Sequence, residues 1–474
     1  FIDIHSHTEL ELLVDPRAES VVRQGVTTQV SGQCGSSPGP WDREAAARVR
    51  EAYRSRYDVD IDFHDLAGFF GRLRRQGAAI NLATMVGAGT VRATVVGEED
   101  RPATAAELER MVALVSEALA AGACGLSSGL EYAPSAFADL AELVALARPL
   151  AAAGLPYATH MRNEDDELFS AVEEALAVGR QAGVPVQISH LKAQGERNWW
   201  KAAPVLGMLE AARANGVDVL YDRYPYVAYS TSLVQLFPIW AHDGGREALL
   251  ARLRDPSLQP RIRAQVADKI AELGSWDAVL ISSVRAESLG WARGRRLGEL
   301  ARERGVEPYD LLVDLTLTDE GRPGMVGFGM SEENTERILA HPLGMIGSDG
   351  SARAVAGPLA GGTPHPRNYG TFPRVLGYYC RERRIMPLET AIHKMTGMPA
   401  ARLQLAGRGR IAPAAFADLV AFDPETVADR ATYENPHQYP VGIPYVWVNG
   451  TLVVKEGEHT GELPGRPLRP GMIA

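Results

Sequence analysis

Short apolar strands alternate with amphipathic helices along most of this chain, and the alternation limits the folds that the chain can adopt. Strands are predicted near residues 2, 28, 82, 126, 158, 188, 219 and 346. Helices are predicted between most of them, and strands separated by helices pair in parallel. Eight such strands without a reversal predict an α/β fold, a closed (β/α)8 TIM-like barrel.

An open, doubly wound sheet is the alternative arrangement of the same elements. Such sheets often carry a Gly-x-Gly-x-x-Gly motif after the first strand, where it binds a dinucleotide. The first predicted strand here lies within FIDIHSH (1–7), and no such motif follows it. The barrel is therefore favoured.

The predicted barrel covers residues 1–404 and contains a long insertion at about 227–344. This segment is far longer than one strand–helix unit needs. We interpret it as a lid over the mouth of the barrel, with a passive surface excursion as the other interpretation. Residues 405–474 carry short strands at 411–413, 417–422 and 445–454, with an Asn449-Gly450 turn, and predict a small β-domain.

The composition excludes several classes of partner. The net charge of −10, without a basic run, argues against nucleic acid and against an anionic membrane surface. No apolar run approaches the ~20 residues of a membrane-spanning helix, and no secretory signal is visible. Three scattered cysteines do not form a disulfide framework, so a cytoplasmic location is expected. Nothing in the sequence indicates an oligomeric state.

Histidine, cysteine and aspartate residues follow the predicted strands at the ends where barrel enzymes keep their chemistry. They are His5, His7, Cys34, His160, His190 and Asp349. Each one alone is more often an ordinary polar residue. Six at strand ends, in register with the alternation, predict a metal centre, and the residue types are those that bind zinc.

Six candidate ligands exceed what one catalytic zinc uses, because such a zinc keeps an open position for water. Either two metals are bound, with Cys34 as a possible bridge, or one tight metal takes three of the ligands. We expect Asp349 to be the general base, because a metal-activated water needs a nearby carboxylate to accept its proton.

The chain resembles the N-acyl-D-amino-acid deacylases of the amidohydrolase superfamily. The motifs that carry the resemblance are FIDIHSH (1–7), GVTTQVSGQCGSSPGP (25–40), GLSSGLEYAP (125–134), THMRNE (159–164), ISHLKAQG (188–195), DRYPYVAYST (222–231), IGSDG (346–350), HPRNYGTFPRVLG (365–377) and ADLVAFDP (417–424). Cys34 is the discriminating residue. Most members of the superfamily bridge their metals with a carboxylated lysine on strand 4, and CGLSSGL at 124–130 contains no lysine.

The resemblance implies zinc-dependent hydrolysis of the amide bond of N-acyl-D-amino acids. It implies a tightly bound zinc on Cys34, His160 and His190, and a weaker site on His5 and His7 that shares Cys34 and Asp349. It also implies that Asp349 takes the proton and later gives it to the leaving amine.

Four further residues match positions that surround the substrate carboxylate in such enzymes: Tyr132, Lys192, Tyr224 and Ser230. Lys192 follows the ligand His190 by two residues, so it points to the same side of the strand and would attract a carboxylate. Packing tyrosines and a solvated lysine are the alternative interpretation.

Two rival functions remain. One is another amidase of the superfamily, dihydroorotase-like or dipeptidase-like. The other is a non-catalytic barrel scaffold, which would be expected to have lost ligands. The resemblance also implies β-strands upstream of residue 1 that would complete the 405–474 domain. Because Phe1 already lies inside an apolar strand, we expect those strands to be missing from this sequence.

Overall fold

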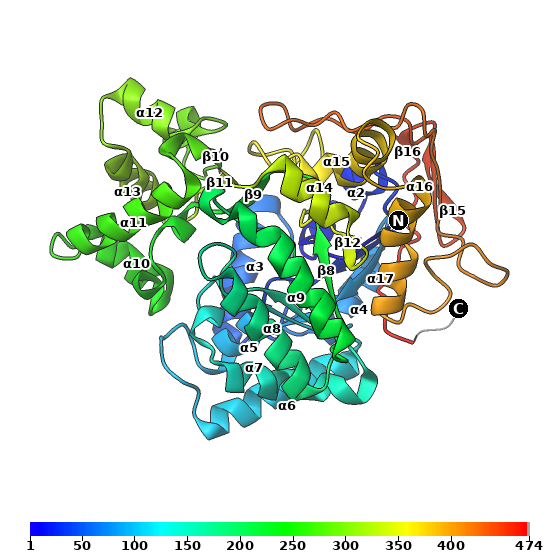
Figure 1. Cartoon of the computed structure of the whole chain (residues 1–474), viewed down its shortest axis with the longest axis horizontal. Helices are drawn as coiled ribbons and strands as arrows, with labels where there is room; N and C mark the ends of the chain where they lie inside the picture. The colour runs from blue at the N-terminus through cyan, green and yellow to red at the C-terminus, as the bar shows by residue number, and fades with distance from the viewer. Residues whose placement is uncertain (472–474) are drawn as a thin grey trace.

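A computed structural model describes residues 1–471, and a ring of parallel strands lies at its centre (Figure 1). The strands are β1 (Ile2–Asp3), β2 (Thr28–Ser31), β3 (Asn81–Thr84), β4 (Val86–Gly87), β5 (Leu126–Gly129), β6 (Tyr157–His160), β7 (Val186–Ile188), β8 (Val219–Arg223) and β12 (Gly344–Ile346). β3 pairs with β2 and β4 pairs with β5, and only Met85 separates the two, so they act as one barrel strand. The order around the ring is therefore the order along the chain.

The ring closes between its last strand and its first. Ser6 and Gly350 form a parallel bridge just beyond β1 and β12. The His7 amide donates to the Gly350 carbonyl at 2.7 Å, and the Asp349 amide donates to the His5 carbonyl at 2.8 Å. The predicted (β/α)8 barrel is confirmed, and its closing contact joins residues near the two ends of the barrel sequence.

A buried carboxylate strengthens this closure. Asp3 accepts hydrogen bonds from the Ser348 amide at 2.8 Å and from the Ser348 hydroxyl at 2.5 Å. It also accepts one from Gln29 Nε2 at 2.9 Å. Its side chain therefore ties β1 to the strands on either side, β2 and β12.

Helices surround the barrel because their apolar residues recur every three or four positions. They include α4 (Leu66–Gln76), α6 (Ala105–Ala121), α7 (Leu140–Ala147), α8 (Leu168–Ala182), α9 (Ala202–Ala214) and α14 (Glu332–Ala340). α4 buries Leu66, Phe69, Phe70 and Leu73 on one face. α6 begins with a capping box between Thr104 and Glu107, which fixes its first turn.

The strand predicted near residue 82 is confirmed as β3, and α5 (Ala88–Val95) begins directly after β4. One local prediction in the C-terminal segment is wrong. Residues 411–413 form no strand, and Ile411 is 90% exposed. Pro413 offers no backbone N–H, which weakens that stretch as a strand.

The segment after β8 forms a separate body at the side of the barrel (upper left in Figure 1). Its antiparallel sheet has the order β10 (Val279–Ser283), β11 (Gly324–Phe328), β9 (Ala228–Ser232). Around it lie α10 (Gly245–Arg254), α11 (Gln259–Leu273), α12 (Leu297–Arg304) and α13 (Pro308–Thr318), with a hydrophobic core of their own. α14 then returns the chain to the barrel, where it packs on α9 and β12.

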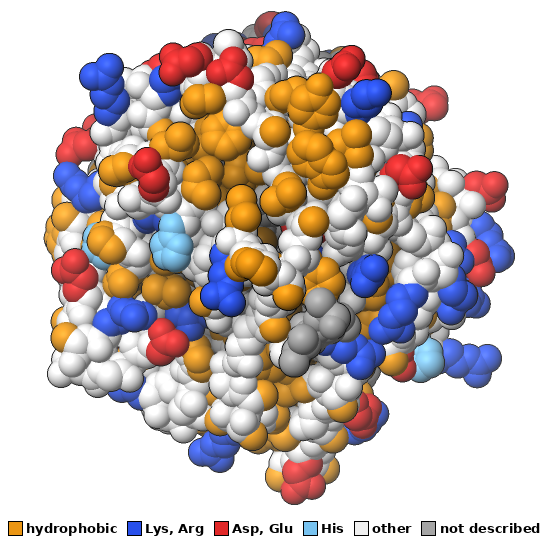
Figure 2. Space-filling view, turned by 90° about the vertical axis from the view of Figure 1, so that its right-hand side faces the viewer, with side chains coloured by type: hydrophobic (Ala, Val, Ile, Leu, Met, Phe, Trp, Pro, Cys, Tyr) orange, Lys and Arg blue, Asp and Glu red, His pale blue; other side chains and the backbone are white. Residues whose placement is uncertain are grey.

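A four-stranded antiparallel sheet lies at the other side of the barrel. It consists of β13 (Leu419–Ala421), β14 (Tyr445–Val448), β15 (Thr451–Lys455) and β16 (Glu458–His459). Asn449 and Gly450, both with positive φ, form the two-residue turn between β14 and β15. Figure 2 views the molecule from this side, where hydrophobic side chains gather on the upper part of the face. All three residues of β13 are half-buried.

Within residues 1–471, none of the helices combines the length and the apolar character needed to cross a lipid bilayer.

The Asp3 network predicts that Asp3→Asn destabilises the fold. The new amide would place an N–H group against donors of Ser348 and Gln29, so the free energy of unfolding should fall by about 1–3 kcal/mol. Urea titration measures this value. The control is Asp314→Asn on α13, where the aspartate is exposed. Equal stability of the two variants would contradict a role for Asp3 in closing the barrel.

Candidate metal centre

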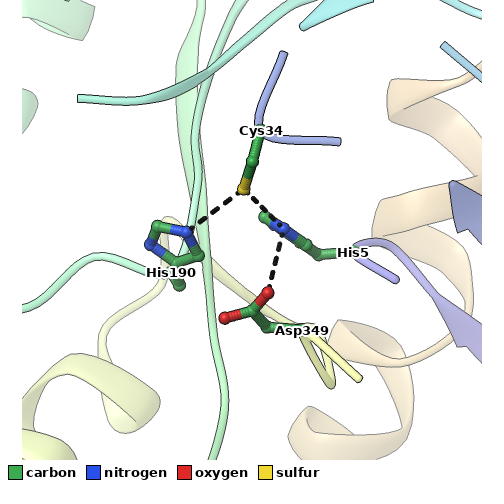
Figure 3. A group of neighbouring side chains, drawn as sticks. All are labelled: His5, Cys34, His190 and Asp349. Atoms are coloured by element: carbon green, nitrogen blue, oxygen red, sulfur yellow. Dashed lines mark hydrogen bonds and ion pairs between the residues drawn. The ribbon is translucent and has the colours of Figure 1, made fainter. Parts of the chain in front are cut away.

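Four side chains from separate strand ends converge at one point at the end of the barrel (Figure 3). Cys34 Sγ lies 3.4 Å from His5 Nε2 and 3.5 Å from His190 Nε2. Asp349 Oδ1 lies 3.5 Å from His5 Nε2. The donor atoms of all four lie within 4.8 Å of one another.

These separations fit a tetrahedral zinc site. Zinc binds nitrogen and oxygen at about 2.0–2.2 Å and thiolate sulfur at about 2.3 Å. Tetrahedral angles then place neighbouring ligand atoms about 3.3–3.6 Å apart. The donor set of thiol, imidazole and carboxylate is also the one that zinc prefers, so these residues fit the metal that the sequence predicted.

The backbone turns sharply to bring three of these residues inward. Cys34, His190 and Asp349 have φ values of 50°, 36° and 50°. Non-glycine residues rarely adopt this left-handed region, and each such residue costs roughly 1–3 kcal/mol. Strained backbone of this kind gathers at functional sites, and here it falls on three predicted ligands.

His160 and His7 lie beside the four converging side chains. The ring centroids of His160 and His190 are 4.6 Å apart. His160 Nε2 lies 3.2 Å from Glu131 Oε2, whereas its buried Nδ1 has no hydrogen-bond partner among the described residues. His7 Nε2 lies 3.1 Å from Asp349 Oδ1. The structure thus brings His5, rather than His160, into the group around Cys34.

A second group of donors shares one histidine with the first. His160, Glu164 and His190 also have ligand atoms within 4.8 Å of one another. His190 therefore belongs to both groups. The donors could bind one metal ion, or two metal ions that share His190.

Two buried carboxylates orient the histidines. Asp222 Oδ1 lies 3.1 Å from His5 Nδ1 and accepts from the His190 amide at 2.8 Å. Glu164 Oε1 lies 3.0 Å from His190 Nδ1. Such a carboxylate keeps the ring nitrogen that it contacts, here Nδ1, protonated. The other ring nitrogen, Nε2, is then free to bind a metal. Sequence reasoning assigned neither role, although Asp222 lies at the end of β8 as the predicted ligands lie at theirs.

The electrostatics of the site favour a bound cation. Desolvation, together with the charges of nearby carboxylates such as Asp349, raises the pKa of the half-buried Cys34 thiol well above its usual value. Burial and the Lys192 ammonium lower the pKa of His190 to about 3, so its imidazole is neutral. A neutral imidazole is the form that binds metals, and a metal is what converts such a thiol to the thiolate.

Asp349 is held as a carboxylate. Burial works against its charge, but the Arg367 guanidinium, at 2.7 Å from Oδ2, keeps the pKa of Asp349 well below its usual range. The aspartate is therefore ionised at neutral pH, which is the form that a general base needs.

The predicted substrate residues line the same cavity, which has a volume of about 1130 Å³. Lys192 Nζ is not free, because it donates to Glu164 Oε2 at 2.5 Å. Tyr224 has a buried hydroxyl without a hydrogen-bond partner in the described part of the chain. Tyr132 OH lies 3.3 Å from Thr231 Oγ1, and Ser230 accepts from Arg367 Nη2 at 3.3 Å through its carbonyl.

Arg162 and His365 lie in two of the motifs that carry the family resemblance. Each makes polar contacts with other residues of the protein. Arg162 pairs with Glu174 at 2.9 Å and donates to two backbone carbonyls. His365 Nε2 lies 2.9 Å from the Ala228 carbonyl, and its Nδ1 accepts from the Arg367 amide at 3.0 Å. His365 thereby positions Arg367 beside Asp349.

The Asp222–His5 contact predicts that Asp222→Asn weakens metal binding roughly 10–100-fold, as loss of a ligand-orienting carboxylate does. Competition with a zinc-binding dye measures the affinity. The control is Asp218→Asn, just before the same strand, where the aspartate pairs with Arg402 at 3.0 Å, outside the donor group. Equal zinc affinity in the two variants would contradict the orienting role.

Known proteins are similar to this chain in sequence. The D-aminoacylase of Alcaligenes xylosoxydans xylosoxydans is 40% identical over 468 residues, covering 99% of this chain and 86% of the relative. The N-acyl-D-glutamate deacylase of the same organism is 36% identical over 471 residues, covering 99% of this chain and 85% of the relative.

A solved structure of a related deacylase has a similar fold. The N-acyl-D-glutamate deacylase of Bordetella bronchiseptica, complexed with zinc and a phosphonate inhibitor, superposes with a TM-score of 0.82 at 34% identity. The superposition covers 99% of this chain and 88% of that one. The model of the amidohydrolase family matches residues 1–454. The chain belongs to the amidohydrolase family.

Proposed function

We propose that this chain is a zinc-dependent deacylase that hydrolyses the amide bond of N-acyl-D-amino acids, releasing a carboxylate and a free D-amino acid. The observation that carries the proposal is the convergence of Cys34, His5, His190 and Asp349, of which Cys34, His190 and Asp349 line a large cavity. The two curated relatives act, by their names, on such substrates. The D configuration rests on these relatives alone.

One zinc is proposed to bind tightly to Cys34, His160 and His190. A weaker second site would use His5 and His7 and share Cys34 and Asp349. Support for the first comes from the His160 Nδ1 atom, which is buried without a partner among the described residues. Support for the second comes from the 3.4 Å approach of His5 Nε2 to Cys34 Sγ. When bound, zinc polarises the amide carbonyl and lowers the pKa of water.

Asp349 is proposed to act as general base and then as general acid. Its carboxylate faces the donor group, so it can accept a proton from the attacking water as the water adds to the carbonyl carbon. The same proton then passes to the nitrogen of the leaving amine as the C–N bond breaks. The Arg367 ion pair keeps Asp349 charged before this transfer.

The α-carboxylate of the substrate is proposed to bind beside Tyr224. Lys192 Nζ lies 6.0 Å and Arg367 Cζ 5.0 Å from the centre of the Tyr224 ring, and all three residues line the cavity. The Tyr224 hydroxyl has no hydrogen-bond partner among the described residues. A carboxylate placed there would accept a hydrogen bond from the Tyr224 hydroxyl and charge-assisted hydrogen bonds from the cations. Tyr132 and Ser230, which line the same cavity, are proposed to complete the binding site.

The rival functions fit these residues less well. A dihydroorotase-type centre needs a carboxylated lysine on the fourth strand, and β5 has the sequence LSSG. A non-catalytic scaffold would not need to keep the complete donor set on strained backbone. A cytoplasmic location is proposed from the three free cysteines, because reducing conditions keep Cys34 available to the metal.

The proposal predicts that zinc-loaded protein releases free amine from N-acetyl-D-methionine and not from N-acetyl-L-methionine. Zinc is measured in the same sample by mass spectrometry. Cleavage of both enantiomers at equal rates, or full activity after the zinc has been removed by a chelator, would contradict the proposal.

Two substitutions separate metal binding from proton transfer. Asp349→Asn should lower kcat by ~10²–10⁴-fold and leave the tight zinc in place, because it removes the acceptor of the proton. Cys34→Ala should lose zinc and activity together, because it removes the thiolate ligand. A Cys34→Ala variant with normal zinc content would contradict the ligand assignment.

A further inference from the structure

Arg223, the last residue of β8, is a buried arginine without a carboxylate partner. It is 1% exposed, and it forms no ion pair with any residue between 1 and 471. Its Nη2 donates to the Tyr226 carbonyl at 2.9 Å and to Thr335 Oγ1 at 3.1 Å. Its Nε and Nη1 have no hydrogen-bond partner within the same residues. Burying an unpaired guanidinium has a large desolvation cost, so we expect its charge to act on a neighbouring group.

The guanidinium of Arg223 lies over the ring of Tyr224. Its Cζ is 4.5 Å from the ring centre, closer than Arg367 Cζ at 5.0 Å and Lys192 Nζ at 6.0 Å. Lys192 and Arg367 each form an ion pair with a buried carboxylate, at 2.5 Å and 2.7 Å. Arg223 has no such partner in the described part of the chain, so these three cations and their partners carry one excess positive charge.

Arg223 is not part of the cavity lining, whereas Tyr224, Lys192 and Arg367 are. Its charge can therefore reach a bound molecule only through its neighbours. The Tyr224 hydroxyl is the suitable one, because it is buried and has no hydrogen-bond partner among the described residues. A cation at the face of a phenol ring draws electron density from it, which makes the O–H group a stronger donor.

The Tyr224 hydroxyl keeps its proton at neutral pH. Burial raises the pKa of Tyr224 above its usual value, and the positive charges of the three cations act in the opposite direction without cancelling this effect. The phenol can therefore donate a hydrogen bond. An anion is the acceptor that gains most from such a donor, because its charge strengthens the bond.

We infer that Arg223 is a positioning residue for the α-carboxylate of the substrate, acting through Tyr224. Its unpaired charge strengthens the Tyr224 hydroxyl as a donor and leaves the site with the excess positive charge that a carboxylate neutralises. The inference rests on the proposed deacylase function and adds to it a residue that does not touch the substrate.

The first test is how the loss of this charge divides between KM and kcat. For zinc-loaded Arg223→Gln, KM for N-acetyl-D-methionine should rise roughly tenfold and kcat should change by less than about threefold. The reason is that the carboxylate is bound alike in the ground state and the transition state. The glutamine amide can still donate to the Tyr226 carbonyl. A purely structural role would instead lower the active fraction, and with it kcat, at an unchanged KM.

Rescue by charge and a matched control accompany this test. Arg223→Lys keeps a cation and should bring KM back to within about threefold of the wild-type value. The control is Arg304→Gln on α12, where an exposed guanidinium lies 3.9 Å from the centre of the Trp291 ring, outside the cavity lining. This variant should keep the KM and kcat of the wild type.

The charge of the substrate provides a second readout. N-acetyl-D-methioninamide has the shape of N-acetyl-D-methionine without its negative charge. The ratio of kcat/KM for the acid to kcat/KM for the amide, measured as released acetate, should fall roughly tenfold in Arg223→Gln. Tyr224→Phe removes the hydroxyl, so adding Arg223→Gln to that variant should lower the ratio by about twofold or less.

The outcomes separate the two proposals. An unchanged KM in Arg223→Gln, or an equal rise of KM in Arg223→Gln and Arg223→Lys, would overturn the role of Arg223 and leave the deacylase function standing. If Arg223→Gln does not fold, Arg223→Lys decides, since a wild-type acid-to-amide ratio supports the inference and a roughly tenfold lower ratio overturns it. Failure of the wild type to cleave any N-acyl-D-amino acid would overturn the proposed function, and this inference with it.

Discussion

The contact that closes the barrel between β1 and β12 is the constraint on which the rest of the site depends. Without it, His5 and Asp349 would lie at opposite edges of an open sheet, and Asp349 could not approach Cys34, which follows β2 beside β1. The hydrogen bonds of Asp3 with Ser348 and Gln29 hold the closing strands in register. Closure also removes the exposed edges that an open sheet would present.

A closed barrel brings strand ends together but does not by itself aim their side chains. Here the left-handed backbone at Cys34, His190 and Asp349 turns the chain inward directly after each strand. That strain costs free energy, and the buried carboxylate Asp222, whose ion-pair partner is only the His5 imidazole, adds a requirement for compensating charge. A metal cation supplies such charge, so we expect metal binding and the stability of this region to be coupled.

The barrel was predictable from the sequence because its signal is repeated. Each strand is short and apolar and each helix has its own periodicity, so errors at one element do not change the fold. The strand predicted near residue 219, for example, is β8 (Val219–Arg223). The error at 411–413 falls outside this alternation, and local composition there did not distinguish a strand from an exposed loop.

The candidate ligands were also predictable, because chemistry in barrels gathers at strand ends. Their partners were not. Lys192 was expected to face the substrate as a cation, and sequence gives no sign that Glu164, far along the chain, neutralises it at 2.5 Å. The part of α11 (Gln259–Leu273) in the cavity lining was hidden for the same reason, since contacts such as that of Lys269 with Asp165 form only in the folded chain.

The central claim is that a zinc ion is bound by the Cys34 thiolate together with histidines. X-ray absorption at the zinc edge of the zinc-loaded protein tests this claim most directly, because sulfur and nitrogen ligands differ in distance and in scattering. The account predicts one sulfur at about 2.3 Å and nitrogen or oxygen ligands at about 2.0–2.1 Å. A zinc shell made only of nitrogen and oxygen would contradict it.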